Sequence, residues 1–277
     1  MSPVDAQRKP SRAGRNLPAA VAVGVGLLVV FGASLFFRPE PFVALVVVAQ
    51  SAALWELRTA FARRDIHIPL TPLLVGGAGM AVSAYAAGAE ALLVAFVLTV
   101  GGVVVWRVLD GSGPRALRDA AAGVFAATYL PFLAGFVLLL LDQPDGELRV
   151  VLFVLLAVAN DVGGYASGVI FGRHPLARSI SPKKSWEGLA GSVLLAVAVG
   201  VAGALLVLDV SWSWGVALGV LTAVTATAGD LAESLVKRDL ELKDMGTLLP
   251  GHGGVLDRLD SLVITAPFVY LVLAATV

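Results

Sequence analysis

The sequence contains no cysteine and few charged residues. Without cysteine the chain can form no disulfide bond and no thiolate, and the redox state of its compartment stays undetermined. Charged side chains make up 14% of the 277 residues, compared with roughly 25% in a typical soluble domain. So little charge cannot cover the surface of a water-soluble fold of this size. With a mean hydropathy of +0.87, the chain is therefore expected to be an integral membrane protein.

The sequence also lacks an excess of positive or negative charge, and it lacks a phosphate-binding glycine loop. The 20 basic and 20 acidic residues cancel, which gives no reason to expect nucleic acid as a partner. No GxxxxGK[ST] pattern occurs, and this excludes a P-loop. Residues 1–16 are basic and precede an apolar run, as in a signal peptide. However, the run 17–37 can span a bilayer and ends without a small-residue cleavage site, so we expect a disordered cytoplasmic leader and a retained first span.

Long apolar runs predict the fold class. In hydrocarbon the backbone must satisfy its own hydrogen bonds, and the runs do not alternate as barrel strands do, so they are expected to be helices. We therefore expect an all-α integral membrane protein, a polytopic bundle of about nine transmembrane helices. The N-terminal helices, 17–148, would form a scaffold or lipid groove, and 149–277 would carry the catalytic region. The nine predicted spans are 17–37, 41–57, 69–88, 90–109, 116–141, 149–171, 188–208, 212–235 and 259–277.

The basic residues predict the orientation in the membrane. If the N-terminus is cytoplasmic, 18 of the 20 basic residues fall in cytoplasmic segments, and only Arg38 and Arg149 fall outside. This asymmetry favours a multi-pass protein of the cell membrane with its N-terminus inside and its C-terminus outside. Glycine-rich stretches at 76–79 and 163–168 suit close helix contacts and allow a homodimer.

Asp161 is the first ionisable residue deep in an apolar run, in the stretch LLAVANDVGGYASG. An intramembrane charge costs on the order of 2.5–3.5 kcal/mol at the centre of the bilayer, so it normally faces the protein interior or water. Asp161 could be a site residue. Alternatively, it could be a buried carboxylate that bonds Asn160 or Tyr165.

The stretch Ser181-Pro-Lys183-Lys184-Ser185 precedes another apolar run. Ammonium groups, hydroxyls and the free N–H groups of a helix start can together bind phosphate. The bland alternative is ordinary juxtamembrane charge, which is common in cytoplasmic loops.

Asp230 and Glu233 are three residues apart and so share a helix face, a turn or two inside the predicted membrane boundary. Two carboxylates there suit a hard cation that prefers oxygen ligands. The alternative is a carboxylate neutralised by Lys237 one turn further on.

The densest mixed charge lies between Ser234 and Asp260, in SLVKRDLELKDMGTLLPGHGGVLDRLD. Asp257 and Asp260 open the last span, where capping explains one carboxylate but not both. Asp230 and Asp257 on adjacent helices predict a divalent-metal site, and the interleaved basic residues would bind phosphates, as in nucleotidyl transfer. His252 could serve in acid–base chemistry or stabilise the turn.

The run S-x-V-K-R-x4-K-D-x-G-x2-L-P-x-H-G-G-V-x-D-R-L-D over 234–260 matches the signature of the phosphatidate cytidylyltransferases, or CDP-diacylglycerol synthases. The SPKKSWEG loop and the Asn160-Asp161 helix also resemble that family. The resemblance is strong over residues 150–277. The N-terminal half is similar only in its hydrophobicity.

The resemblance implies the reaction of CTP with phosphatidate to give CDP-diacylglycerol and pyrophosphate, with Mg²⁺ and a companion K⁺. It suggests Asp230 and Asp257 as metal ligands and catalytic residues, together with Lys237 and Arg258. The residues expected to bind substrate are Asp161, Ser181, Lys183, Lys184, Ser185, Arg238, Lys243, His252 and Asp260.

Two rival functions follow from the same residues. A related CTP-dependent transferase could act on a polyprenol or an archaeal-type lipid, and only the N-terminal spans could discriminate it. A transporter with a cytoplasmic ion site is less consistent with the sequence, because the opposite half of the bilayer carries almost no charge.

Overall fold

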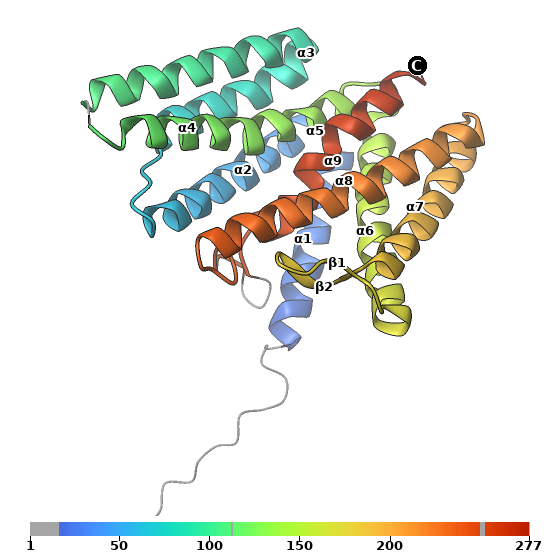
Figure 1. Ribbon diagram of the computed structural model, residues 1–277. Coiled ribbons are helices and arrows are strands. Elements are labelled where there is room, and N and C mark those ends of the chain that lie inside the picture. The colour runs from blue at the N-terminus through green and yellow to red at the C-terminus, as the bar shows by residue number, and fades with distance from the viewer. Residues whose placement is uncertain (1–16, 112, 250–252, 277) are drawn as a thin grey trace, which may run out of the picture.

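The computed structural model describes residues 17–111, 113–249 and 253–276, and this part of the chain is almost entirely helical (Figure 1). The predicted leader 1–16 and His252 lie outside the described residues. The elements are α1 (Leu17–Phe37), α2 (Pro39–Ala62), α3 (Leu70–Leu109), α4 (Ala116–Ala127), the π-helix η1 (Thr128–Phe132), α5 (Leu133–Leu141), α6 (Gly146–Phe171), β1 (Pro175–Ala177), β2 (Ser181–Ser185), α7 (Trp186–Leu206), α8 (Trp212–Asp239) and α9 (Leu256–Ala274).

The all-α membrane class is confirmed. Within the described residues, six helical segments are long and apolar enough to cross a membrane. One of them, α3, consists of two helical segments that meet at Gly88, where φ is 77° and helical geometry is interrupted. The predicted runs 69–88 and 90–109 correspond to these two segments. The exact count of nine spans stays a prediction.

Two local features interrupt the helices. Pro131 lies inside η1, the π-turn that joins α4 to α5; because proline has no N–H, the ordinary helical hydrogen-bond pattern cannot continue through it. The segment 172–187, expected only as a non-spanning connection, forms an antiparallel hairpin in which Pro175 pairs with Ser185 and Ala177 with Ser181. This hairpin places the SPKKS residues on a strand.

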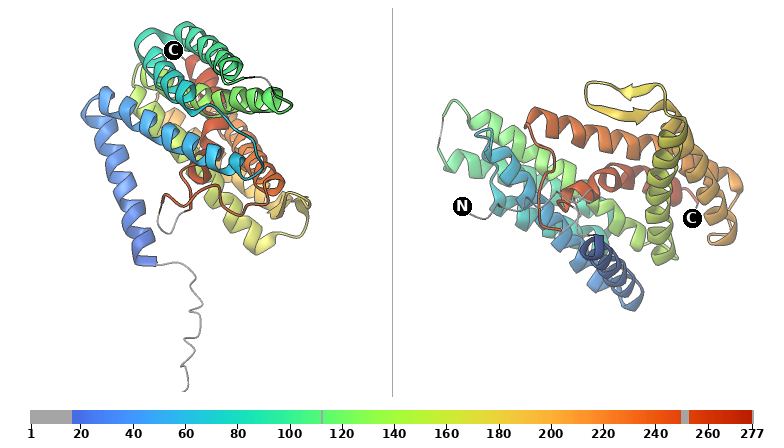
Figure 2. Two further views of the ribbon diagram at one scale, coloured as in Figure 1. Left: turned by 90° about the vertical axis from the view of Figure 1, so that its left-hand side faces the viewer. Right: turned by 90° about the horizontal axis from the view of Figure 1, so that it is seen from below.

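Close glycine contacts hold α6, α7 and α8 together. A Cβ on Gly200 would collide with the backbone of Gly215, and a Cβ on Gly163 would collide with that of Gly191. Small residues allow such helix contact where hydrophobicity cannot drive association. By contrast, α1 stands away from most of the bundle and packs mainly along α2 (Figure 2).

Arg149 clamps the start of α6 to the end of α9. The residue is 5% exposed. Its guanidinium donates to the carbonyls of Pro144 and Leu273, both at 2.8 Å, and to the side chains of Gln143 and Thr276 at 3.1 and 3.3 Å. Two backbone carbonyls and two side chains at the two helix ends therefore share one donor side chain.

Replacement of Arg149 by Met should lower the free energy of unfolding by roughly 1–3 kcal/mol, because the carbonyls of Pro144 and Leu273 lose a charged donor that joins the two helix ends. Chemical denaturation in detergent measures the change. Arg38→Met is the matched control, since Arg38 is exposed and forms no ion pair among the described residues. Equal stability of both variants would contradict the clamp.

Candidate active site

A cavity of about 440 Å³ opens between α6, α7, α8, α9 and the hairpin, and we call it cavity A. It brings together groups that are up to a hundred residues apart in the sequence. Eight of the 13 predicted site residues line it: Asp161, Lys183, Lys184, Ser185, Asp230, Asp257, Arg258 and Asp260.

A second cavity of about 530 Å³, cavity B, lies beside the last turns of α8. Four predicted site residues line it: Ser181, Lys237, Arg238 and Lys243. The structure therefore divides the predicted set between two cavities. The division occurs along β2, because Ser181 lines cavity B whereas Lys183 and Lys184 line cavity A.

The hairpin is tied to α8 at two points. The ammonium of Lys184 pairs with the carboxylate of Asp230, and Nε of Arg238 donates to the carbonyl of Ile180 at 3.2 Å. The two α8 residues are eight positions apart, about 12 Å along the helix. The hairpin consequently runs alongside α8, which is visible in the right-hand view of Figure 2.

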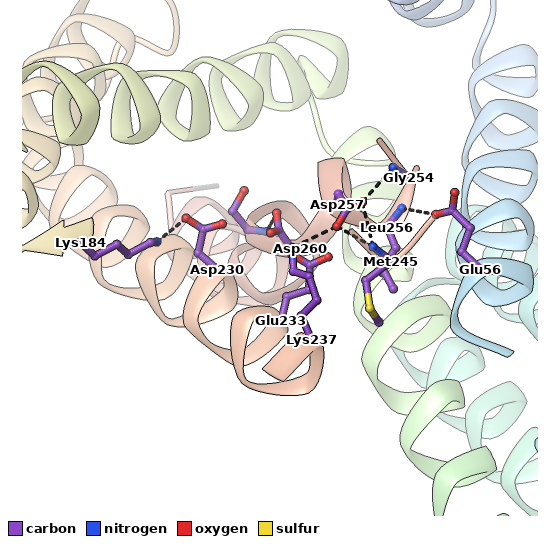
Figure 3. Close-up of polar contacts among 11 residues, drawn as sticks. Glu56, Lys184, Asp230, Glu233, Lys237, Met245, Gly254, Leu256, Asp257 and Asp260 are labelled. Atoms are coloured by element: carbon purple, nitrogen blue, oxygen red, sulfur yellow. Dashed lines mark hydrogen bonds and ion pairs between the residues drawn. The ribbon is translucent and has the colours of Figure 1, made fainter. Parts of the chain in front are cut away.

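Lys237 joins α8 to the start of α9. Its ammonium lies 2.7 Å from a carboxylate oxygen of Glu233 and 3.0 Å from one of Asp257. The side chain of Glu233 is 2% exposed and that of Asp257 is 8% exposed. Figure 3 shows these groups pointing toward one another between the two helices. The ammonium of Lys237 thus compensates two buried carboxylates, and the carboxylate neutralised by Lys237 one turn further on is that of Glu233.

The backbone around Asp257 holds its carboxylate. The N–H of Gly254 donates to it at 2.8 Å, and the N–H of Met245 donates to its two oxygens at 3.1 and 3.2 Å. Gly254 precedes Asp257 by three residues, so this bond resembles the return bond of a capping box. Asp257 is therefore fixed by contacts from α8, from the 240–249 segment and from its own helix start.

Asp161 and Ser185 combine a structural contact with a position on cavity A. The amide of Asn160 donates to the carboxylate of Asp161 at 3.0 Å. The hydroxyl of Ser185 accepts from the N–H of Gly188 at 3.1 Å and so caps the start of α7. Asp161 therefore bonds Asn160 and also lines cavity A, and its role as a site residue stays a prediction.

The donor set of cavity A fits a hard divalent cation. Magnesium in nucleotide sites takes one or two carboxylates and completes its shell with water and phosphate oxygens. Asp230 and Asp257 provide such carboxylates from adjacent helices. Among residues 17–111, 113–249 and 253–276, no three acidic or histidine side chains are grouped to hold a metal by themselves.

Glu56 is a charged residue beside the site that the sequence did not predict, whereas Glu233 was expected to share a helix face with Asp230. Glu56 of α2 is 3% exposed and accepts a hydrogen bond from the N–H of Leu256 at 2.9 Å, directly beside Asp257. Its signal was the same as that of Asp161, a carboxylate in an apolar run. It lies near the end of the predicted span 41–57, where a charge is easily assigned to the membrane surface.

Comparison with known proteins gives a consistent result. The model of the "Cytidylyltransferase family" matches residues 18–276. The chain is 40% identical to the phosphatidate cytidylyltransferase of Mycobacterium bovis over 95% of this chain and 90% of the relative. It is 42% identical to that of Mycobacterium leprae over 92% and 86%, and 43% identical to that of Brucella suis over 61% and 59%.

Fold and site define a polytopic helical membrane protein with an acidic and basic cavity at one end of its last four helices. The chain belongs to the cytidylyltransferase family. The match includes α1 to α5 as well as the signature helices, so the relationship is not confined to the site.

Replacement of Lys237 by Met should lower the free energy of unfolding by about 3–5 kcal/mol, because Glu233 and Asp257 would remain as buried, uncompensated charges. Denaturation in detergent measures the loss, and Glu233→Gln in the same chain should recover part of it. Lys243→Met is the control, since Lys243 is exposed and has no ion-pair partner among the described residues. If both lysine variants lose equal stability, the compensation by Lys237 is refuted.

Proposed function

We propose that this protein is a phosphatidate cytidylyltransferase, which converts CTP and phosphatidate into CDP-diacylglycerol and pyrophosphate. The main support is cavity A, where acidic and basic side chains face one space beside the exposed, apolar outer face of α6. Tyr165 lines the cavity and is 76% exposed, and Val169 one turn further is 68% exposed. A lipid could thus keep its chains in the bilayer while its phosphate reaches the charged groups.

The proposed reaction is a displacement at phosphorus. A phosphate oxygen of phosphatidate forms a bond to the α-phosphorus of CTP, and the bond from that phosphorus to the oxygen bridging to the β-phosphorus breaks. The bonding electrons leave with pyrophosphate. The protein's part is to position the two phosphates and to neutralise their charge. Lys184 pairs with Asp230 and Lys237 with Asp257, and Arg258 also lines cavity A, so these three would supply the positive charge.

Asp230 and Asp257 would hold the divalent cation, which we propose to be Mg²⁺. When bound, this ion would neutralise charge on the phosphates. Lys184 pairs with Asp230 in the structure, and it would turn to a phosphate when a cation takes its place. The companion K⁺ stays an expectation from the family resemblance, without an assigned residue.

The two cavities suggest a division of the substrates. Lys237 lines cavity B, while its partner Asp257 lines cavity A, so the boundary between the cavities lies at this pair. We place the α-phosphate of CTP at the boundary and the two departing phosphates in cavity B, near Arg238 and Lys243. The lipid phosphate would occupy cavity A.

Location and orientation follow from the same proposal. CTP is a cytosolic metabolite, so the charged end of the bundle would face the cytoplasm of a multi-pass protein in the cell membrane. That orientation agrees with the distribution of basic residues, which puts the N-terminus inside.

Purified wild-type protein in detergent should release pyrophosphate when given CTP, phosphatidate and Mg²⁺. Chelation of the cation should stop the release, and added Mg²⁺ should restore it. Asp257→Asn should lower kcat by about 10³-fold or more, because it removes a charge at the reacting phosphate. Asp239→Asn is the control, since Asp239 is exposed at the end of α8 and lines neither cavity.

The lipid in this assay distinguishes the rival functions. Activity with a polyprenol or an archaeal-type lipid and none with phosphatidate would favour the related transferase. No pyrophosphate release with any lipid, together with ion flux in proteoliposomes, would favour a transporter.

A matched lysine pair tests the division of the substrates. Lys243→Ala should raise the KM for CTP roughly tenfold through loss of a phosphate contact in cavity B, with the KM for phosphatidate unchanged. Lys183→Ala, in cavity A, should show the reverse. Steady-state kinetics with each substrate varied in turn decides the assignment, and the opposite pattern would exchange the cavities.

A further inference from the structure

Glu56 is a buried carboxylate in an apolar part of the molecule. It belongs to α2, and its residue is 3% exposed. The neighbouring core includes Leu57 of the same helix, together with Leu240, Met245 and Leu256 from the C-terminal region. Burial of a carboxylate in such surroundings is costly unless it is hydrogen-bonded or compensated, so its contacts indicate why it is tolerated.

The Glu56 carboxylate lies against the α8–α9 connection and the first residue of α9. Oε2 accepts a hydrogen bond from the N–H of Leu256 at 2.9 Å, across 200 residues of sequence. A Cβ on Gly254 would lie 2.6 Å from Oε2, and one on Gly246 would collide with Oε1. Two glycines of the family signature thus make room for this carboxylate. Figure 3 shows Glu56 approaching from the side opposite to Asp260 and Lys237.

The electrostatic partner of Glu56 is a helix start. Within the described residues, no Lys, Arg or His forms an ion pair with it, and its Oε1 is buried without a hydrogen-bond partner. Leu256 is the first residue of α9, and a helix N-terminus carries partial positive charge on its free N–H groups. The carboxylate therefore fixes the N-terminus of α9 both by a hydrogen bond and by charge.

This anchor is adjacent to the reacting groups. The N–H of Leu256 goes to Glu56, while the N–H of Gly254 goes to Asp257 at 2.8 Å. The backbone of this short segment is thus shared between two carboxylates, one on α2 and one on α9. We propose that Glu56 is a positioning residue, which holds the first turn of α9 so that Asp257 faces Lys237 and cavity A. The inference rests on the proposed function for its kinetic consequence.

Glu56→Leu separates positioning from stability. Leucine removes the buried charge, but it also takes away the acceptor of the Leu256 N–H, so the thermal midpoint should fall only modestly and the protein should stay folded at the assay temperature. In contrast, kcat should fall about 10- to 100-fold because Asp257 shifts, with the KM for CTP within about twofold. Glu56→Gln keeps an acceptor but loses the charge, and its kcat should lie between those of wild type and Glu56→Leu.

Gln50→Leu is the matched control. Gln50 lies on the same helix, six residues or about 9 Å earlier. It is 2% exposed, and its side chain has no hydrogen-bond partner among the described residues. Since it does not contact the start of α9 through any described bond, its replacement should leave kcat unchanged. An equal loss of kcat in both leucine variants would overturn the proposal.

Hydrogen exchange tests the anchor without any substrate. Amides of residues 253–260 should exchange faster in Glu56→Leu, while those of α7 should not change. Gly246→Ala should also lower kcat, because its Cβ collides with Glu56, and combination with Glu56→Ala should add no further loss. Additive losses would show that the two residues act separately, against the proposal.

Each outcome decides the question. Unchanged kcat and unchanged protection of 253–260 in Glu56→Leu overturn the inference. If Glu56→Leu does not fold, Glu56→Gln and Gly246→Ala take its place, and wild-type kcat in both overturns it. If wild type itself releases no pyrophosphate, the proposed function fails, and the exchange data alone establish or refute the anchor.

Discussion

The arrangement of the charged end depends on one ammonium group between two buried carboxylates. Lys237 is held on α8, and its contacts with Glu233 and Asp257 fix where α9 can start relative to α8. In surroundings of low polarity, an uncompensated charge costs far more than it does in water. The helix pair therefore has one favourable register, and cavities A and B open on either side of that pair.

Much of the fold could be predicted from the sequence, because hydrocarbon permits few backbone solutions. The predicted runs agree closely with the helices, for example 188–208 with α7 (Trp186–Leu206) and 259–277 with α9 (Leu256–Ala274). The hairpin at 175–185 was not predicted, since a polar segment of that length gives no apolar alternation to read. Neither was the π-turn around Pro131, because the apolar run 116–141 continues through the proline and predicts a single helix.

The sequence could predict which residues line the site, but not how they are arranged in it. The signature identified Asp257, and helix spacing put Asp230 on a neighbouring helix. Sequence spacing alone could not show that Ser181 and Lys183, two residues apart on a strand, face different cavities. The contribution of Glu56 was hidden for another reason: its partner is the backbone N–H of Leu256, and a backbone partner leaves no trace in side-chain patterns.

The contact between Glu56 and Leu256 also has a consequence for biogenesis. The two groups are separated by 200 residues, which a ribosome takes about 10–40 s to translate at ~5–20 residues per second. During that interval α2 can already reside in the bilayer with its carboxylate unmatched. Synthesis of α9 supplies the N–H of Leu256, which then donates to the Glu56 carboxylate. The protein would thus gain its competent site only when the last helix is inserted, and nascent chains would carry no premature activity.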